Sequence, residues 1–136
     1  YTVLSEGDDL QDPIADASRA ILDGHIVLSR ALADSGHFPA VDIEKSISRV
    51  MPSVTSSEHQ QMARSVKQLY SSYQQSKDLI AIGAYVRGSD PQLDKAIAMM
   101  PNINRFLQQG MHDVVAYDDS LQALSQLAPV ARSNTA

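Results

Sequence analysis

One long amphipathic helix limits what this chain can fold into more than any other feature of its sequence. Apolar residues recur in steps of four, three, four and seven, at Met62, Val66, Leu69, Tyr73 and Ile80. In an α-helix this spacing puts the side chains on one face. Thr55 and Glu58 stand before the run with the spacing of a capping box. The pattern predicts a helix of about 25 residues, roughly 37 Å long at 1.5 Å per residue.

Further helices are expected after this one. Asp90 followed by Pro91 has the form of an N-cap with proline at the first helical position. We expect Pro101 to begin a separate helix, and Asp118 or Ser120 to cap a last one. The chain is therefore predicted to be entirely helical from about residue 53 onward.

The first 36 residues show a different pattern, in which short apolar runs alternate with residues that typically start or end helices. The runs Tyr1–Leu4 and His25–Leu28 predict two short buried strands. Asp12 before Pro13 predicts the start of a helix between them, and Gly24 is expected to end that helix. Such an alternation of strands and helices is typical of an open α/β sheet.

A second short helix is predicted to start after Ser29, as its cap, and to end at Gly36. Residues 38–52 show no clean period, and we expect a long ordered loop there. The predicted fold class is therefore mainly α, with two short strands in an α/β part that an all-helical part follows. Two strands do not form a stable sheet alone, and the chain opens on an apolar run without Met. We therefore expect a piece of a longer protein.

Charge and composition exclude several classes of protein. The 16 acidic residues against 11 Lys and Arg give a formal charge of −5, which argues against a nucleic-acid-binding surface. The absence of Cys excludes disulfides and thiolate zinc sites. No apolar run reaches the roughly 18–20 residues that a membrane span needs.

An acidic cluster near the start is the first candidate site, formed by Glu6, Asp8, Asp9 and Asp12. A calcium loop needs Gly at its sixth and Glu at its twelfth position, and neither spacing is present. The cluster is therefore interpreted as a solvated loop with a helix cap. The four His residues include no pair four positions apart, so no metal site is predicted.

Arg49 is the second candidate, in the irregular segment between the α/β part and the helices. An Arg there can be a surface charge, or it can stabilise transition-state charge in a neighbour's site. The residues alone favour a surface charge. For Phe38 and Met111, which bracket loops, core packing is favoured over contact with a nucleotide base. The chain has no G-x-x-x-x-G-K-[ST] loop, so it cannot cradle a nucleotide's phosphates alone.

Several motifs in order resemble one family over nearly the whole chain. They are Leu22–Arg30, Gly36–Asp42, Ser46–Met51, Asp78–Tyr85 and Gly88–Pro91, with Gly7–Asp9 and Asp12–Asp16 before them and Asp94–Ile97 and Phe106–Gln109 after them. These runs resemble the C-terminal part of the bacterial flagellar and type III secretion ATPases, which are homologues of the rotary ATP synthase subunits. The late motifs are most similar to the flagellar export ATPases, with the injectisome ATPases as the alternative.

The resemblance implies that residues 1–52 are the C-terminal part of a RecA-like ATPase domain and that residues 53–136 form a helical C-terminal domain. It implies a homohexamer with nucleotide at the subunit interfaces, in which Arg49 is the catalytic arginine finger that reaches a neighbour's γ-phosphate. Such a finger is worth about 10³–10⁵ in rate. Phe38 would pack on the adenine, and Met111 lies near a second adenine contact that is often aromatic in the family.

The implied function is ATP hydrolysis that energises flagellar type III protein export, with ATP and Mg²⁺ as cofactors of the whole protein. The Walker A loop, the catalytic glutamate and the magnesium-binding carboxylate of the family lie upstream, so this chain alone is expected to be inactive. The acidic residues Glu6, Asp8, Asp9 and Asp12 would face a coiled-coil stalk protein through salt-sensitive contacts.

Export chaperones and export substrates are the other implied partners, and nucleic acid is not among them. The expected location is cytoplasmic, peripheral at the base of the flagellar export apparatus, with contact to the membrane export gate only through partners. Two alternatives stay open. One is an injectisome ATPase, and the other is a non-catalytic helical module that binds a stalk, a chaperone or an export substrate.

Overall fold

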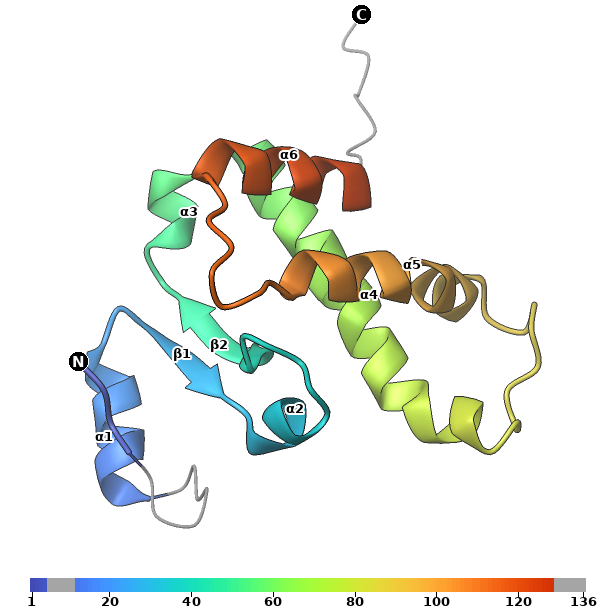
Figure 1. Ribbon diagram of the computed structural model, residues 1–136, viewed down its shortest axis with the longest axis horizontal. Coiled ribbons are helices and arrows are strands. Elements are labelled where there is room, and N and C mark those ends of the chain that lie inside the picture. Colours follow the sequence, from blue (N-terminus) through green and yellow to red (C-terminus); the bar gives the residue numbers. More distant parts are fainter. Residues whose placement is uncertain (5–11, 129–136) are drawn as a thin grey trace, which may run out of the picture. The chain divides into compact units, whose positions relative to one another are not determined.

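The computed structural model describes residues 1–4 and 12–128. The chain divides into two compact units, Tyr1–Val54 and Thr55–Ala136, which we call the N-terminal and the C-terminal unit. Figure 1 labels their helices and strands. The described residues are mainly helical and include two short strands, both in the N-terminal unit, which confirms the predicted fold class.

The N-terminal unit is built around a two-stranded antiparallel sheet, β1–β2. In chain order its elements are α1 (Pro13–Ile21), β1 (Gly24–Leu28), α2 (Arg30–Asp34), β2 (Val41–Ser48) and α3 (Met51–Val54). Gly24 pairs with Ser48 at one end of the sheet, and Leu28 pairs with Val41 at the other. The two strands lie side by side in Figure 1.

The start of α1 confirms the predicted helix signal. The Asp12 carboxylate accepts a hydrogen bond from the Ala15 backbone N–H at 3.0 Å, with Pro13 at the first helical position. The predicted end of α1 is wrong. The helix stops at Ile21, and Gly24 is the first residue of β1. The backbone of Leu22 is already extended there, so the chain enters the strand without a left-handed turn.

Two predictions about strands are also wrong. Tyr1–Leu4 is not a strand, because an apolar run becomes one only when a neighbouring backbone pairs with it. The stretch expected as a loop contains β2 and α3 instead. The pairing slips between His25 and Val27, so that residues 43–46 of β2 bulge out opposite a single residue of β1. This bulge breaks the period-2 pattern that identifies a strand.

The bulge is held by one hydroxyl group. Ser46 Oγ accepts from the Val27 N–H at 2.9 Å and donates to the Asp42 carbonyl at 2.6 Å. It satisfies two backbone groups that the interrupted strand pairing leaves over. The short helix α2 begins as predicted, with the Ser29 hydroxyl accepting from the Leu32 N–H, and Gly36 follows it with φ of 76°.

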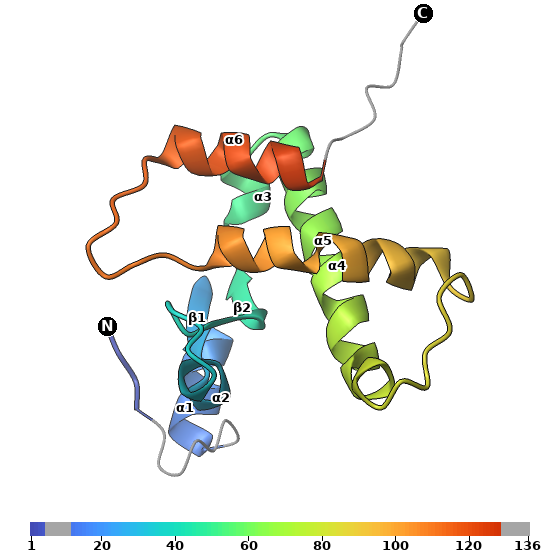
Figure 2. The same ribbon diagram turned by 45° about the vertical axis from the view of Figure 1, so that its right-hand side comes forward.

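The C-terminal unit consists, within the described residues, of α4 (Ser57–Ala81), α5 (Pro91–Leu107) and α6 (Tyr117–Leu127). Figures 1 and 2 show α5 crossing α4. All three helices contribute buried side chains to one core, namely Met62, Val66, Leu69 and Tyr70 from α4, Leu93, Ala96, Met100 and Ile103 from α5, and Leu124 and Leu127 from α6. The predicted helix of about 25 residues is thus confirmed, and its apolar face forms the core.

The caps of two helices differ from the prediction. Ser56, not Thr55, caps α4, with its hydroxyl accepting from the His59 N–H at 3.2 Å. Neither Asp118 nor Ser120 caps α6, which begins at Tyr117 without a side-chain cap. Instead Asp118 lies in the first turn, where a carboxylate interacts favourably with the helix dipole.

Pro101 does not begin a separate helix. It lies inside α5, which continues to Leu107. A proline in a helix interior costs about 3 kcal/mol. Met100 and Ile103, on either side of it, are both buried, and each such burial contributes roughly 1.5–3 kcal/mol. Packing therefore outweighs the break that proline favours. No helix in residues 1–4 and 12–128 is long and apolar enough to cross a membrane.

Candidate functional site

Arg49 follows directly after β2 and is tied to the far end of α1. Its guanidinium group donates to the backbone carbonyls of Arg19 at 3.3 Å and Ala20 at 3.4 Å. Its backbone N–H donates to the Asp23 carbonyl at 2.7 Å. The last carbonyls of a helix lack partners within the helix and carry partial negative charge, so a cation is stabilised there.

The Arg49 side chain is nevertheless exposed at this corner. A guanidinium group has five N–H donors in a rigid fork that matches phosphate oxygens. The two contacts to α1 use two of these donors and fix the plane of the group. The arrangement combines a held position with donors that an anion from outside the chain can reach.

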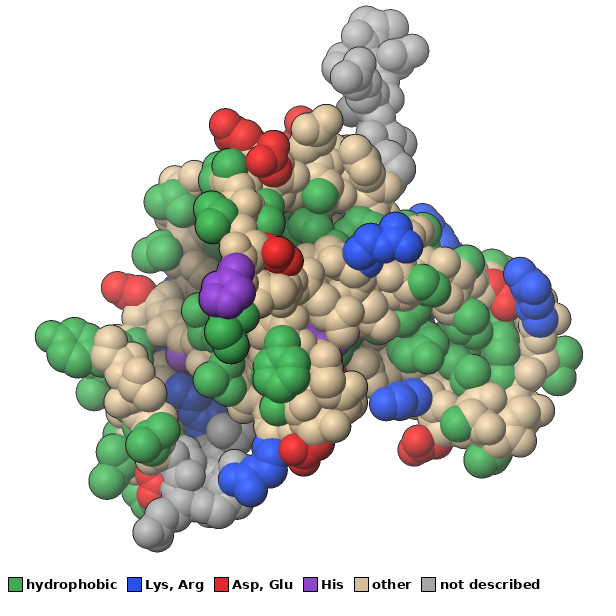
Figure 3. Space-filling view, in the orientation of Figure 1, with side chains coloured by type: hydrophobic (Ala, Val, Ile, Leu, Met, Phe, Trp, Pro, Cys, Tyr) green, Lys and Arg blue, Asp and Glu red, His purple; other side chains and the backbone are tan. Residues whose placement is uncertain are grey.

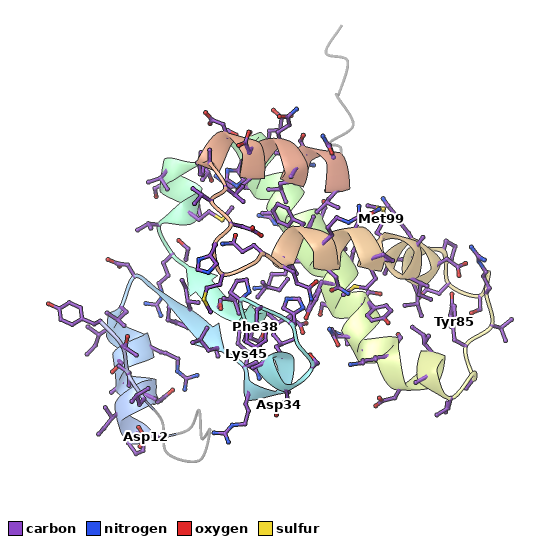
Figure 4. All side chains as sticks on the ribbon, viewed as in Figure 1. Asp12, Asp34, Phe38, Lys45, Tyr85 and Met99 are labelled. Atoms are coloured by element: carbon purple, nitrogen blue, oxygen red, sulfur yellow. The ribbon has the colours of Figure 1, made fainter. Side chains whose placement is uncertain are left out.

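Phe38 lies in the connection between α2 and β2, where Figure 4 labels it. Its side chain is 55% exposed. Arg49 lies at the other end of β2. Four residue steps of β1 separate the two ends of the sheet, which is about 14 Å at 3.4 Å per residue. The structure therefore does not bring Phe38 and Arg49 together within the N-terminal unit.

Met111 lies in the C-terminal unit, in the connection between α5 and α6. Its side chain is 93% exposed. The Asp113 carboxylate holds the adjacent backbone by accepting from the Gly110 N–H at 2.6 Å. The expectation that Phe38 and Met111 serve core packing is wrong for both residues in this structure, because neither is buried.

The acidic candidates divide in two. Asp12 is the N-cap of α1, and its carboxylate accepts from the Ala15 N–H. Glu6, Asp8 and Asp9 lie outside the described residues. Within residues 1–4 and 12–128 no three His, Asp or Glu side chains are grouped closely enough to hold a metal ion.

The turn between α4 and α5 carries features that helix periodicity does not reveal. Asp94 accepts from the Tyr85 hydroxyl at 3.0 Å and, through its other oxygen, from the Gly88 N–H at 2.8 Å. Partial burial raises the pKa of the Tyr85 phenol, and the hydrogen bond that its hydroxyl donates to the Asp94 carboxylate raises it further. The side chain is labelled in Figure 4.

Apolar side chains surround this turn. Leu79 is 52% exposed, Ile82 75% and Val86 71%. Figure 3 shows hydrophobic side chains gathered over this end of the C-terminal unit. Aspartate, glycine and tyrosine near such a turn are a signal that sequence inspection could have used.

A shallow hollow of about 220 Å³ lies among the three helices of the C-terminal unit. It is lined by Ser65, Gln68, Leu69, Gln92, Lys95, Leu127 and Ala128. Ligand pockets are usually about 300–1,000 Å³ and mostly apolar. The hollow is therefore too small and too open to indicate a cofactor site.

Comparison with known proteins identifies the class of this chain. A model of the C-terminal domain of the type III secretion ATPase EscN matches residues 55–126. A model of the nucleotide-binding domain of the ATP synthase alpha/beta family matches residues 1–48. The chain belongs to the flagellar and type III secretion ATPase family, whose nucleotide-binding domain is related to the ATP synthase alpha and beta subunits. The family resemblance seen in the sequence motifs is thereby confirmed.

Particular relatives narrow this class. The flagellum-specific ATP synthase of Salmonella typhimurium is 58% identical over 129 residues, which are 95% of this chain and 28% of the relative. The SPI-2 type 3 secretion system ATPase of the same organism is 48% identical over 127 residues, which are 93% of this chain and 29% of the relative.

Two solved structures are also similar. The assembled ATPase EscN from enteropathogenic E. coli has a TM-score of 0.91 and 47% identity, and the match covers 94% of this chain and 31% of EscN. EscN in complex with its central stalk EscO has a TM-score of 0.81 and 46% identity, and the match covers 85% of this chain and 29% of EscN. The chain thus spans less than a third of the length of each of these proteins.

Proposed function

We propose that this chain is the C-terminal part of an ATPase that energises flagellar type III protein export. The observation that carries the proposal is its 58% identity to the flagellum-specific ATP synthase over nearly its whole length. In the whole ATPase, this chain follows the portion that carries the phosphate-binding loop. The chain alone does not hydrolyse ATP, since that loop is absent from it.

Arg49 is the arginine finger of this ATPase, acting on the nucleotide of a neighbouring subunit in a homohexamer. Its position at an exposed corner, with donors left over after two backbone contacts, supports this role. The guanidinium fork neutralises charge that develops on the γ-phosphate, and in other ATPases and GTPases this accelerates the reaction by about 10³–10⁵. ATP is bound with Mg²⁺ held by residues outside this chain.

Phe38 and Met111 contribute contacts to the adenine. Their exposure supports this, because an aromatic ring and a thioether open to solvent can both pack on a base. Residues 1–52 complete the nucleotide-binding domain, and residues 53–136 form the helical C-terminal domain.

Glu6, Asp8, Asp9 and Asp12 face a coiled-coil stalk protein, and export chaperones and substrates are further partners. The complex of the relative EscN with its central stalk supports a stalk partner. Contacts of an acidic segment with a basic coiled coil weaken as salt rises. The ATPase acts in the cytoplasm, peripherally at the base of the export apparatus, and reaches the membrane export gate through these partners.

A second candidate is the ATPase of a virulence type III secretion system. The high structural similarity to EscN favours it. Within Salmonella typhimurium, however, this chain shares 58% of its residues with the flagellar protein and 48% with the SPI-2 protein. Restoration of swimming in a strain that lacks its flagellar ATPase, when the whole ATPase carrying this chain is supplied, is the outcome expected of the flagellar assignment.

The role of Arg49 is tested in the whole ATPase. Arg49→Ala should lower kcat by about 10³-fold while the affinity for nucleotide stays within about threefold. Arg64→Ala is the matched control, because Arg64 is an exposed arginine on α4 in the other unit, and it should keep normal activity. An Arg49→Ala enzyme that hydrolyses ATP normally would refute the finger role of this residue.

A further inference from the structure

A glycine on the neighbouring strand lies against the end of β2 that carries Arg49. Gly24 is the first residue of β1 and pairs with Ser48, the last residue of β2. A Cβ atom at Gly24 would lie 2.8 Å from the Ile47 carbonyl oxygen and 3.3 Å from the Ser48 Cα. Both are backbone atoms, which cannot rotate away as a side chain can. The two strands therefore approach each other more closely here than any residue with a side chain would allow.

Arg49, the next residue after Ser48, also lies close to the chain that leads into β1. Immediately beyond the Gly24–Ser48 pair, the Arg49 N–H donates to the Asp23 carbonyl at 2.7 Å. The side chain then reaches back to the carbonyls of Arg19 and Ala20 at the end of α1. The end of α1, the connection to β1 and the start of β1 thus hold both the backbone and the guanidinium group of one residue.

We propose that Gly24 is a positioning residue for the arginine finger. Without a side chain at position 24, the end of β2 settles close enough to β1 for Arg49 to reach the carbonyls of α1. These carbonyls fix the plane of the guanidinium group before a neighbour's nucleotide meets it. This inference rests on the proposed function of Arg49 and adds the residue that allows its guanidinium group to be oriented.

The expected effect follows from the geometry. A Cβ at 2.8 Å from a carbonyl oxygen must push the end of β2 away by several tenths of an ångström. The shift acts on Ser48 and is passed to Arg49 as the next residue. A displacement of about 1 Å in a catalytic group can cost about 10²-fold in rate. Gly24→Ala should therefore lower kcat by about 10- to 100-fold without a comparable change in KM for ATP.

The test is a double-mutant cycle in the whole ATPase with Gly24→Ala, Arg49→Ala and both together. If Gly24 acts through Arg49, Gly24→Ala should change kcat less than twofold once Arg49 is already Ala. Val27→Ala is the matched control. It removes atoms from the same strand and weakens the sheet, but places no atom against Ser48. It should lower thermal stability and leave kcat per folded ring within about twofold.

A milder variant covers the case in which Gly24→Ala does not assemble. Ala20 is exposed at the end of α1, so Ala20→Gly loosens the backbone that offers its carbonyl to Arg49 and removes no core atom. It should lower kcat a few-fold in the presence of Arg49 and have no effect in the Arg49→Ala background.

The outcomes separate the two proposals. An equal fall in kcat for Gly24→Ala in both backgrounds, or a folded Gly24→Ala ring with normal kcat, would overturn the positioning role while the finger stands. If Gly24→Ala fails to assemble, a normal kcat for Ala20→Gly overturns it instead. Normal activity of Arg49→Ala would overturn the finger itself. A fall in kcat that depends on Arg49, with KM within about threefold, supports both.

Discussion

Replacing Asp94 by Asn should open the turn between α4 and α5. The two carboxylate oxygens of Asp94 accept from different groups, the Tyr85 hydroxyl at 3.0 Å and the Gly88 N–H at 2.8 Å. Asn has a single acceptor oxygen, which can keep the bond from the Gly88 N–H, and its NH₂ group can donate to the Tyr85 oxygen, so both contacts become weaker hydrogen bonds between neutral groups. The variant also loses a negative charge in the first turn of α5.

The magnitude follows from these two losses. A hydrogen bond to a charged group contributes about 1.5–3 kcal/mol, and one between neutral groups about 0.5–1.5 kcal/mol. Because Asp94 is half-buried and Gly88 is exposed, each of the two weakened bonds should lose about 0.5–1 kcal/mol. The charge near the helix N-terminus contributes about 0.3–1 kcal/mol more. The closed turn should therefore lose about 2 kcal/mol, which is roughly a 30-fold change in the opening equilibrium.

Native-state amide hydrogen exchange at Gly88 is the direct assay, since this N–H is itself one of the donors. Its protection factor should fall roughly 30-fold in Asp94→Asn. Asp118→Asn makes the same charge change in the first turn of α6 and should leave Gly88 exchange within about twofold. Unchanged exchange at Gly88 in Asp94→Asn would refute the reasoning, because it would mean that the carboxylate does not hold the turn.

Three further predictions concern the C-terminal unit. Ile103 is fully buried, so Ile103→Ala should lower the free energy of unfolding by about 2–5 kcal/mol in urea denaturation; a loss below about 1 kcal/mol would contradict this. Ser56→Ala should cost about 1 kcal/mol in the same assay, and Thr55→Ala less than half of that, because only the Ser56 hydroxyl caps α4. The pKa of Tyr85 is raised from 10.0, so the folded state holds this proton more tightly than the unfolded state. The resulting stability is complete below pH 10.0 and is lost as the pH rises through the folded pKa. Urea midpoints measured from about pH 9 upward should fall more steeply for the wild type than for Tyr85→Phe, and parallel curves would exclude the contribution.

Signals that act within one turn of helix allowed much of this fold to be predicted. Asp12 and Ser29 cap the helices that follow them, as expected from residue type alone. The apolar steps that include Met62, Val66 and Leu69 define the buried face in the first half of α4. Each of these features depends on residues within four positions of one another, so the sequence displays them directly.

The features that could not be predicted depend on residues far apart in the sequence. Strand β2 is hidden because its bulge breaks the alternation, and only pairing with β1 makes it a strand. Tyr1–Leu4 has the composition of a strand but lacks that pairing in this structure. Pro101 continues a helix that its residue type would break, because the core on either side holds it.

The surroundings of Arg49 show the same limit at the candidate site. Family motifs single out the residue, but the groups that hold it are the backbone carbonyls of Arg19, Ala20 and Asp23. Any residue type at those positions offers a carbonyl, so side-chain patterns cannot reveal the contact. The one constraint that leaves a trace in the sequence is Gly24, where a side chain would meet the backbone of β2. A helix-ending glycine and a strand-spacing glycine look alike in a sequence, and only the paired strand distinguishes them. The position of the proposed finger is therefore encoded mainly in backbone geometry, which is why a glycine on the neighbouring strand should affect kcat through Arg49.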